Sequence, residues 1–438
     1  MLQRKIEPVI EQHLKSKSRS ILLIDGARQV GKTYIVRYVG NKLFENFIEI
    51  NLLEDKLDKQ LFAHVKNVND FYLTLSSVAG TKMKNKDNTL IFIDEIQAYP
   101  HFLTLLKFLA DDAKFSYIGS GSLLGVTLAQ TSSIPMGSIK KIRMYPLDFE
   151  EFMLANGVGK LMIDSMKNSY MSRESLGESQ HNMAMDLFRK YLLVGGLPDA
   201  VKEFLKTKNI EEVRYIQEQT HEYYSIDASK YDMENKLKIQ TIYELIPSCM
   251  ENKKKRMIAK EIENKKGATF KTYREEFDYL VGAGIALEVS AISNPHFPLI
   301  ESSSKNLLKL YLSDVGMLTN ILYKTNIRPM LDDVRSVNLG AVYESVVASE
   351  LNAHGHTLFY YDNRSKGEVD FLIDDYDNLS VLPIEVKSGR DYSIHSALNN
   401  LTKTDAYGIK EAFVLSNERI VKSRGKITYL PIYYVMFL

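Results

Sequence analysis

The chain has 438 residues, of which 45% are hydrophobic and 25% charged, and its 56 basic and 55 acidic side chains leave a formal net charge of +1. At roughly 100–200 residues per domain, this length predicts two to four domains. The apolar content excludes a largely disordered chain. The near-neutral balance excludes nucleic-acid binding through overall charge alone, so any nucleic-acid site must be local.

The single cysteine, Cys249, has no partner for an intramolecular disulfide or a cysteine-based zinc site, which favours a reducing, cytoplasmic setting. The start of the chain, Met1 to Glu7, mixes charges and lacks the apolar core of a signal peptide, so secretion is not expected. The uncharged stretch 115–139 is punctuated by Ser, Thr, Gln and Gly. It predicts a buried strand and a polar loop rather than a membrane span, so no membrane partner is expected.

Short apolar runs alternate with helical segments from Ile21 to about Asp148, which predicts an open parallel sheet covered by helices. Most residues of these runs are apolar, as in strands buried on both faces. The predicted strands are Ile21–Ile24, Phe47–Asn51, Leu90–Ile93 and Phe115–Ile118.

The pattern of polar and apolar residues changes twice in the middle of the chain. Residues 157–180 are polar and without periodicity, which predicts an insertion or a mobile loop, and helical spacing resumes over 182–206 around a Gly-Gly-Leu-Pro break. Three helical patterns and two short strand-like runs then outline a winged helix: Ile239–Met250, Arg256–Glu263, Tyr273–Ala283, Ile285–Ile292 and Leu307–Leu312. Helical proteins produce such an outline easily, so the winged helix is a hypothesis.

The last hundred or so residues predict a further α/β unit, with a helix at Gly340–Ala353 and another near Ser393–Thr404. Its strands are predicted at Leu358–Tyr361, Val369–Ile373, Leu382–Val386 and Ala412–Leu415. The whole chain is therefore predicted as α/β, with a parallel sheet, a helical connector, a winged-helix domain and a C-terminal α/β domain. The predicted boundaries are 1–155, 156–234, 235–325 and 326–438.

A phosphate-binding loop follows the first strand, because Gly26-Ala27-Arg28-Gln29-Val30-Gly31-Lys32-Thr33 matches Gly-x-x-x-x-Gly-Lys-Ser/Thr between a strand and a helix. Glycines let backbone N–H groups wrap a phosphate, and the helix adds its positive amino-terminal end. Lys32 would reach the β- and γ-phosphates of ATP, and the Thr33 hydroxyl would ligate Mg²⁺. A chance glycine turn would not combine strand, loop, lysine and hydroxyl in this register.

The second half of the nucleotide site is predicted at Asp94 and Glu95, which end an apolar strand. Asp94 would hold the magnesium shell and Glu95 would orient or deprotonate the attacking water, although two such acids can also cap a following helix. Ser120, or alternatively Ser122, would contact the γ-phosphate or the water, if this segment is more than an ordinary turn. Arg28 is interpreted as solvated, and Arg143 as an arginine finger or a surface residue.

Near the carboxyl terminus, Asp370, Glu385 and Lys387 lie on two predicted strands. Residues two apart on a strand point to one side, so Glu385 and Lys387 share a face. If the strands are neighbours, Asp370 and Glu385 can hold Mg²⁺ or Mn²⁺ while Lys387 activates water, and Glu344 adds a carboxylate from the inward side of its helix. Alternatively, Glu344 compensates the helix dipole, and the other three form a cross-strand salt bridge. Glu368 is expected to be solvated.

These motifs resemble a known family. The N-terminal part is similar to AAA-type ATPases of the STAND-like, archaeal-ATPase group, on Gly26–Thr33, Leu90–Gln97, Gly119–Ser122, Tyr145–Phe152 and Tyr191–Pro198. The C-terminal part resembles DUF4143, a domain of unknown function with a PD-(D/E)xK nuclease-like core. The resemblance implies a P-loop NTPase sheet at the N-terminal end and a restriction-endonuclease-like α/β fold at the C-terminal end. It also implies the nucleotide roles above and a nuclease pattern formed by Glu344, Asp370, Glu385 and Lys387. Met136-Gly137-Ser138 stands where many relatives carry Gly-Arg, which leaves the arginine finger unassigned.

A local basic stretch in the winged-helix candidate predicts a few phosphate contacts with DNA, or else a solvated helix face. It comprises Lys253, Lys254, Lys255, Arg256, Lys260, Lys265, Lys266, Lys271 and Arg274. We expect an ATP-hydrolysing protein whose nucleotide state controls the winged helix and a nuclease-like domain on DNA. The alternative is a nucleotide-gated regulatory protein with a silent nuclease-like docking domain, which would retain a protein or nucleic-acid partner in the ATP state. For either function, the partners considered include a further protein or a second copy of the chain in a homo-oligomer.

Overall fold

The computed structural model describes residues 2–16, 18–122, 137–228, 236–252, 255–263, 269–302, 304–331, 339–388, 393 and 395–438. By the density of its internal contacts the chain divides into two compact units. The first unit contains residues 3–145 and 282–284, and the second contains residues 146–281 and 285–438. The predicted connector, winged helix and nuclease-like domain therefore share one compact unit.

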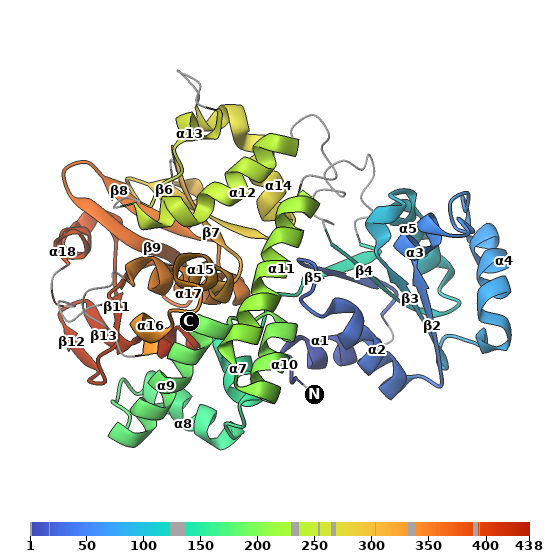
Figure 1. Cartoon of the computed structure of the whole chain (residues 1–438), viewed down its shortest axis with the longest axis horizontal. Helices are drawn as coiled ribbons and strands as arrows, with labels where there is room; N and C mark the ends of the chain where they lie inside the picture. The colour runs from blue at the N-terminus through green and yellow to red at the C-terminus, as the bar shows by residue number, and fades with distance from the viewer. Residues whose placement is uncertain are drawn as a thin grey trace. The chain divides into compact units, whose positions relative to one another are not determined.

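The first unit is a five-stranded sheet in the order β2-β3-β4-β1-β5, and every neighbouring pair is parallel (Figure 1). The four predicted strands are confirmed, and β5 is an additional edge strand. The strands are β1 (Ile21–Asp25), β2 (Asn46–Asn51), β3 (Thr89–Asp94), β4 (Ser116–Gly121) and β5 (Ile139–Arg143). Around them lie α1 (Ile6–Lys15), α2 (Lys32–Leu43), α3 (Leu52–Leu57), α4 (Val68–Ala79), η1 (Gly80–Lys82), η2 (Ile96–Ala98) and α5 (His101–Asp112).

Helices cover both faces of this sheet, which explains why its central strands are apolar throughout. Every residue of β1 and of β3 is buried. On one face, Ile91 and Ile93 belong to a core cluster with Phe102 of α5. On the other face α2 approaches so closely that a Cβ at Gly40 would lie 2.5 Å from the Phe47 ring. A side chain there would separate helix and sheet.

The parallel arrangement brings the carboxyl ends of all five strands to one edge of the sheet. The loop after β1 begins at Gly26, and β3 ends at Asp94. Strand β4 lies between these two strands, so Ser120 is carried between the loop and the acidic strand end. Strand order, rather than closeness in sequence, assembles the predicted nucleotide residues at one place.

The second unit combines helices with an eight-stranded mixed sheet in the order β12-β13-β11-β10-β9-β8-β6-β7. The strands are β6 (Ala286–Ile292), β7 (Ser304–Leu312), β8 (Phe359–Asn363), β9 (Gly367–Asp375), β10 (Ser380–Val386), β11 (Ala412–Ser416), β12 (Lys422–Arg424) and β13 (Ile427–Pro431). The helices are α7 (Phe149–Ala155), α8 (Lys160–Met171), α9 (Glu178–Val194), α10 (Pro198–Thr207), α11 (Ile210–Ala228), α12 (Lys236–Glu251), α13 (Ala259–Glu263), α14 (Arg274–Gly282), α15 (Val315–Tyr323), α16 (Arg328–Leu331), α17 (Gly340–Ala353) and α18 (Ser396–Thr402). Short 3₁₀ turns are η3 (Phe270–Tyr273), η4 (Leu299–Glu301), η5 (Asp405–Tyr407) and η6 (Ile432–Phe437).

The three helices and two strands of the winged-helix outline form in the predicted order, but the two strands are not a separate ribbon. Strand β6 pairs antiparallel with β7 and parallel with β8, with Ser290 opposite Phe359. The ribbon is thus the edge of the C-terminal sheet. Local periodicity reveals a strand but not its partner, so sequence alone could not show this continuity.

Of the two interpretations of 157–180, the mobile loop is wrong, and the insertion stays a prediction. Helix α8 occupies half of this segment and buries Ile163, Met166 and Tyr170. These residues are spaced three and four apart, which places them on one helix face. Because the helix has polar residues on its other faces, its average composition concealed this narrow apolar stripe.

A buried arginine ties the helices of the second unit together. Arg214 of α11 donates hydrogen bonds to the backbone oxygens of Leu193 (3.1 Å), Gly316 (3.1 Å) and Lys324 (3.0 Å). Its side chain therefore joins α11 to the end of α9 and to both ends of α15. In the described part of the chain, no helix is long and apolar enough to cross a lipid bilayer.

Candidate functional site

The loop after β1 has the backbone geometry of an anion cradle. Gly31, the residue before α2, has φ of 96°, and Gly26 has φ of 150°. A Cβ at Gly26 would lie 2.2 Å from the backbone oxygen of Met144, so only glycine fits there. The loop ends at the amino terminus of α2, where unpaired N–H groups and the helix dipole attract phosphate.

Lys32 is folded into this loop. Its ammonium group donates to the backbone oxygens of Gly26 (2.9 Å) and Ala27 (2.7 Å), and the residue is 6% exposed. Burial lowers the pKa of Lys32, and the carboxylates of Glu95 and Asp94 oppose that change. A buried cation beside a glycine cradle is what a nucleotide phosphate requires, so the residues present fit ATP.

The Thr33 hydroxyl and the Asp94 carboxylate meet beside Lys32. Thr33 Oγ1 donates to Asp94 Oδ2 at 2.7 Å, although Thr33 lies in the first turn of α2 and Asp94 ends β3. The other oxygen, Asp94 Oδ1, accepts from the Ser120 hydroxyl and, at 3.0 Å, from the backbone N–H of Glu95. Hydroxyl and carboxylate oxygens are ligands that Mg²⁺ prefers, so this pair fits a magnesium ion.

Glu95 leaves β3 in a left-handed backbone conformation, with φ of 54° and ψ of 46°. Its Oε2 accepts a hydrogen bond from the Gln97 side-chain amide, and the same amide nitrogen lies 3.0 Å from Ser122 Oγ. Sequence reasoning missed Gln97. The available signal was a polar residue within an otherwise apolar turn, Ile96-Gln97-Ala98.

The two arginines considered for this site lie at the same edge of the sheet. Arg28 was interpreted as solvated, but its Nε donates to Ser122 Oγ at 3.2 Å, which connects the phosphate loop to the end of β4. Arg143 ends β5 opposite Asp25, and its guanidinium lies 5.9 Å from the centre of the Tyr145 ring. Its role as an arginine finger stays a prediction.

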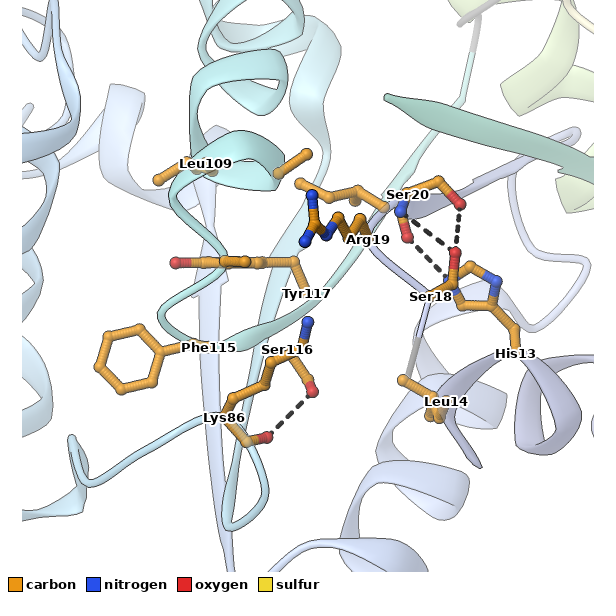
Figure 2. A pocket seen from close by; sticks show the side chains of 13 residues that line it. His13, Leu14, Ser18, Arg19, Ser20, Lys86, Leu109, Phe115, Ser116 and Tyr117 are labelled. Carbon is orange, nitrogen blue, oxygen red and sulfur yellow. Dashed lines mark hydrogen bonds between the residues drawn. The ribbon is translucent and has the colours of Figure 1, made fainter. Parts of the chain in front are cut away.

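A small cavity at the opposite edge of the sheet is distinct from this site (Figure 2). It lies at the amino ends of β1 and β4, lined by His13, Arg19, Ser20 and Tyr117 among others. Its volume is about 20 Å³. That is room for about one water molecule, which excludes a nucleotide.

The second candidate site lies in the C-terminal sheet, where the predicted adjacency of two strands is confirmed. Strands β9 and β10 are antiparallel neighbours, with Ile384 opposite Phe371. Asp370 Oδ2 accepts from the backbone N–H of Val386 at 2.8 Å, and Lys387 donates to Glu385 Oε1 at 2.7 Å. Asp370, Glu385 and Lys387 are therefore brought together.

Glu344 joins them from α17, and its interpretation as helix-dipole compensation is wrong. The first turn of α17 contains no acidic residue, and Glu344 is buried beyond it. Its carboxylate forms an ion pair with Lys255, lies 3.8 Å from the ammonium of Lys309, and accepts from the Tyr311 hydroxyl at 3.2 Å. The helix therefore delivers this acid to the cluster rather than to its own amino terminus.

Cations from β7 and from the segment before α13 compensate this carboxylate cluster. Lys309, only 1% exposed, pairs with Glu368 at 2.8 Å, and Arg256 contacts Glu368 at 2.6 Å and Asp362 at 2.8 Å. Glu368 was expected to be solvated, but it is held by these two cations. Sequence reasoning missed both as site residues, because they lie some 60 to 110 residues away along the chain.

Burial and crowding of acids shape the electrostatics of the cluster. Burial raises the pKa of Asp370 well above its ordinary value, and Glu344 and Glu385 add to this change. Burial also raises the pKa of Glu385, against the attraction of Lys387. The pKa of Lys387 is raised, because attraction to Glu385 and its neighbours outweighs the effect of burial.

Two carboxylates of this cluster lie beside lysine ammonium groups. Within the described ranges, no three His, Cys, Asp or Glu side chains are grouped so that they could hold a metal ion. Lysine ammonium groups occupy the positions next to Glu344 and Glu385 instead. The roles of Glu344, Asp370 and Glu385 as Mg²⁺ or Mn²⁺ ligands stay a prediction.

Several residues of the predicted basic stretch form ion pairs within the protein. Lys255 and Arg256 bind carboxylates of the cluster, and Arg274 binds Asp278 at 2.7 Å and Glu288 at 3.0 Å. The remaining described members, Lys260 and Lys271, are exposed. The other four, Lys253, Lys254, Lys265 and Lys266, lie outside the described residues.

Comparison with known families agrees with the two ends of the predicted organisation. Residues 18–153 match an AAA domain, residues 185–328 a domain of unknown function (DUF8612), and residues 339–435 another domain of unknown function (DUF4143). The chain thus carries an AAA-type ATPase domain at its N-terminal end and DUF4143 at its C-terminal end. None of the curated proteins matches the sequence.

Two solved structures are distantly similar. One is a Walker-type ATPase of Pyrococcus abyssi, with 13% identity and a TM-score of 0.46 over 73% of this chain and 95% of that one. The other is the Pif1 helicase from Candida albicans, with 14% identity and a TM-score of 0.24 over 42% of this chain and 47% of that one. Neither similarity is close enough to bear on function.

Proposed function

We propose that the first unit binds ATP together with Mg²⁺ and hydrolyses it. The observation that carries this proposal is the 2.7 Å contact of Thr33 with Asp94 beside the buried Lys32. In the sheet, β4 lies between β1 and β3, and the carboxyl ends of β1 and β3 lie at the same edge. The Thr33 hydroxyl, the Asp94 carboxylate and the Lys32 ammonium group therefore lie together beside the glycine-containing loop. That combination supports phosphoryl transfer to water.

Each residue of the site has a distinct part in this proposal. The loop from Gly26 to Gly31 binds the phosphates through its backbone, and Lys32 turns from the loop oxygens to the β- and γ-phosphates. Thr33 and Asp94 hold Mg²⁺, which would neutralise charge on the phosphate oxygens when bound. Glu95 takes a proton from the attacking water, and Ser120 fixes the Asp94 carboxylate.

The test is phosphate release from ATP by the full chain and by Lys32→Ala, with and without Mg²⁺. We expect loss of turnover by at least about 100-fold in the variant, because the transition state loses its principal side-chain cation. Lys42→Ala is the matched control, since Lys42 lies on the same helix, is exposed and pairs with Glu7 and Glu11. Equal turnover by Lys32→Ala and wild type would contradict the proposal.

For the C-terminal carboxylate cluster we propose a structural role in a docking domain rather than metal-dependent cleavage. The pairing of Glu344 with Lys255 and of Glu385 with Lys387 supports this choice, because those carboxylates already have cationic partners. The test is cleavage of single- and double-stranded DNA and RNA with Mg²⁺ and Mn²⁺. We expect none. Cleavage that disappears in both Asp370→Ala and Lys387→Ala would establish the nuclease alternative.

We propose DNA as the partner whose retention depends on the bound nucleotide. Within the basic stretch, the exposed Lys260 and Lys271 are the described members left to contact phosphates. Because few contacts are available, binding should be weak, tolerant of sequence and sensitive to salt. The test is fluorescence anisotropy of labelled duplex DNA with ATP or ADP, for wild type and for Lys260→Glu/Lys271→Glu. Equal binding by both proteins would remove DNA contact from this surface.

A further inference from the structure

A chain of side chains connects the phosphate loop to Glu95. Arg28 of the loop donates to Ser122 Oγ at 3.2 Å, and Ser122 Oγ accepts from Gln97 Nε2 at 3.0 Å. Gln97 Nε2 also donates to Glu95 Oε2. The chain thus runs from the first phosphate-binding residues through β4 to the carboxylate that follows β3.

Burial of the Gln97 amide at this position costs folding free energy. It is 5% exposed, and its Oε1 is buried without a hydrogen-bond partner in the described structure. An ionised carboxylate only accepts hydrogen bonds, so the amide nitrogen must face Glu95 and the amide oxygen must point away from it. A leucine would fill this site between Ile96 and Ala98 without burying an unsatisfied oxygen.

Glu95 is itself held in a costly conformation. A residue other than glycine with φ of 54° carries backbone strain, which is sustained only where surrounding contacts enforce it. The backbone N–H of Glu95 donates to Asp94 Oδ1, and its side chain accepts from Gln97. Both ends of the residue are thus fixed by neighbours at the same strand end.

We propose that Gln97 is a positioning residue for ATP hydrolysis, holding Oε2 of Glu95 so that Oε1 is presented to the attacking water. This inference rests on the proposed ATPase function. In the step that it serves, the water oxygen bonds to the γ-phosphorus while the bond from that phosphorus to the bridging oxygen breaks. The bonding pair leaves with ADP, and the water proton passes to Glu95.

The experiment is steady-state ATP hydrolysis and equilibrium ATP binding by Gln97→Leu. We expect kcat to fall about 10- to 100-fold, the usual consequence of losing a hydrogen bond to a charged group. The dissociation constant for ATP should change less than about two-fold, because Gln97 contacts the carboxylate of Glu95 and would not contact the bound phosphates. Gln12→Leu is the matched control, since Gln12 is exposed on α1 of the same unit.

A double-mutant cycle separates positioning from general damage. In a Glu95→Gln background, Gln97→Leu should lower kcat no further, because the group that it positions is already lost. An unchanged kcat in the single variant, or an equal loss in both backgrounds, would overturn the positioning role while leaving the ATPase function intact. A wild type without turnover overturns both proposals. Weakened ATP binding in Gln97→Leu would show a structural role instead, and also overturns this one.

Discussion

The two polar clusters of this protein differ in how their acids are balanced. In the nucleotide site, Asp94 is surrounded by hydroxyl and N–H donors, and the nearby cation, Lys32, donates to loop backbone oxygens rather than to a carboxylate. In the C-terminal cluster, Glu344 and Glu385 each contact an ammonium group. In the first arrangement the carboxylate has no ammonium partner among the described residues and can bind a divalent cation, whereas in the second two of the carboxylates already have cationic partners.

The difference teaches that a complete motif does not establish a metal site. Asp370, Glu385 and Lys387 have the spacing of a nuclease, and their strands pair as that spacing requires. Lys255 and Lys309 form ion pairs with Glu344 and Glu368, yet both lysines lie outside the motif. A carboxylate paired with a buried lysine gains little from a metal unless the lysine leaves.

The largest effect is expected at Glu95. Glu95→Gln should lower kcat about 100- to 10,000-fold while ATP still binds, because the amide has the same shape but cannot accept the water proton. Glu385→Gln, the equivalent change in the other cluster, should leave kcat within about two-fold of wild type. The measurement is phosphate release at saturating ATP. A similar loss in both variants would end the distinction between an active and a structural cluster.

The next effect concerns stability. Lys309→Met should lower the free energy of unfolding by about 3–5 kcal/mol, because Glu344 and Glu368 would lose a fully buried cationic partner. Adding Glu368→Gln should restore part of the loss, since one of the uncompensated acids is then removed. Urea unfolding of Lys309→Met, Glu368→Gln, the double variant and wild type measures this. No recovery in the double variant would show that Lys309 acts through packing rather than charge.

The sequence predicted the nucleotide site in detail because its signals are local. A strand, a glycine loop and a helix start follow one another within thirteen residues, and an apolar run followed by two acids marks β3. Backbone chemistry requires those residue types at that spacing, so the pattern alone is informative. Gln97 escaped because a single polar residue in a turn has no spacing to recognise.

The C-terminal cluster was predictable only in part, because its balance depends on pairings between distant segments. The face shared by Glu385 and Lys387 follows from strand periodicity. Strand periodicity does not predict that β7 lies at the edge of the same sheet, and β7 is the strand that brings Lys309 and Tyr311 to the cluster. The helix at 160–171 was missed for a different reason, since its buried stripe is too narrow to raise its average hydrophobicity.

A third prediction tests the comparison by removing a cationic partner of Glu344 in the C-terminal cluster. Lys255→Met should raise Mn²⁺ affinity about 10-fold, because Glu344 would lose its partly exposed cation and could serve as a metal ligand. Electron paramagnetic resonance of free Mn²⁺ measures binding, with Asp94→Ala in both proteins to remove the metal ligand of the nucleotide site. Lys260→Met is the control, since Lys260 is exposed. Unchanged binding would show that Lys255 does not compete with a metal.

The smallest effect provides a reference away from both clusters. His221 of α11 stacks on Tyr243, with ring centres 5.0 Å apart, and its Nε2 is buried without a hydrogen-bond partner in the described structure. Burial lowers the pKa of His221, against the opposing attraction of Glu244, Glu222 and Glu218. Below the unfolded value of about 6.5, the unfolded chain therefore binds a proton that the folded chain resists, and stability falls as pH decreases.

His221→Phe should weaken this pH dependence, because phenylalanine keeps the ring contact with Tyr243 and takes up no proton. Between pH 7.5 and 5.5 we expect the wild-type melting temperature to fall about 2 °C more than that of the variant. His64→Phe, at another histidine, is the control. Because neither cluster contains His221, the difference should persist in Lys309→Met. Its disappearance there would mean that the pH response arises from the carboxylate cluster, and the second unit would then titrate through its acids.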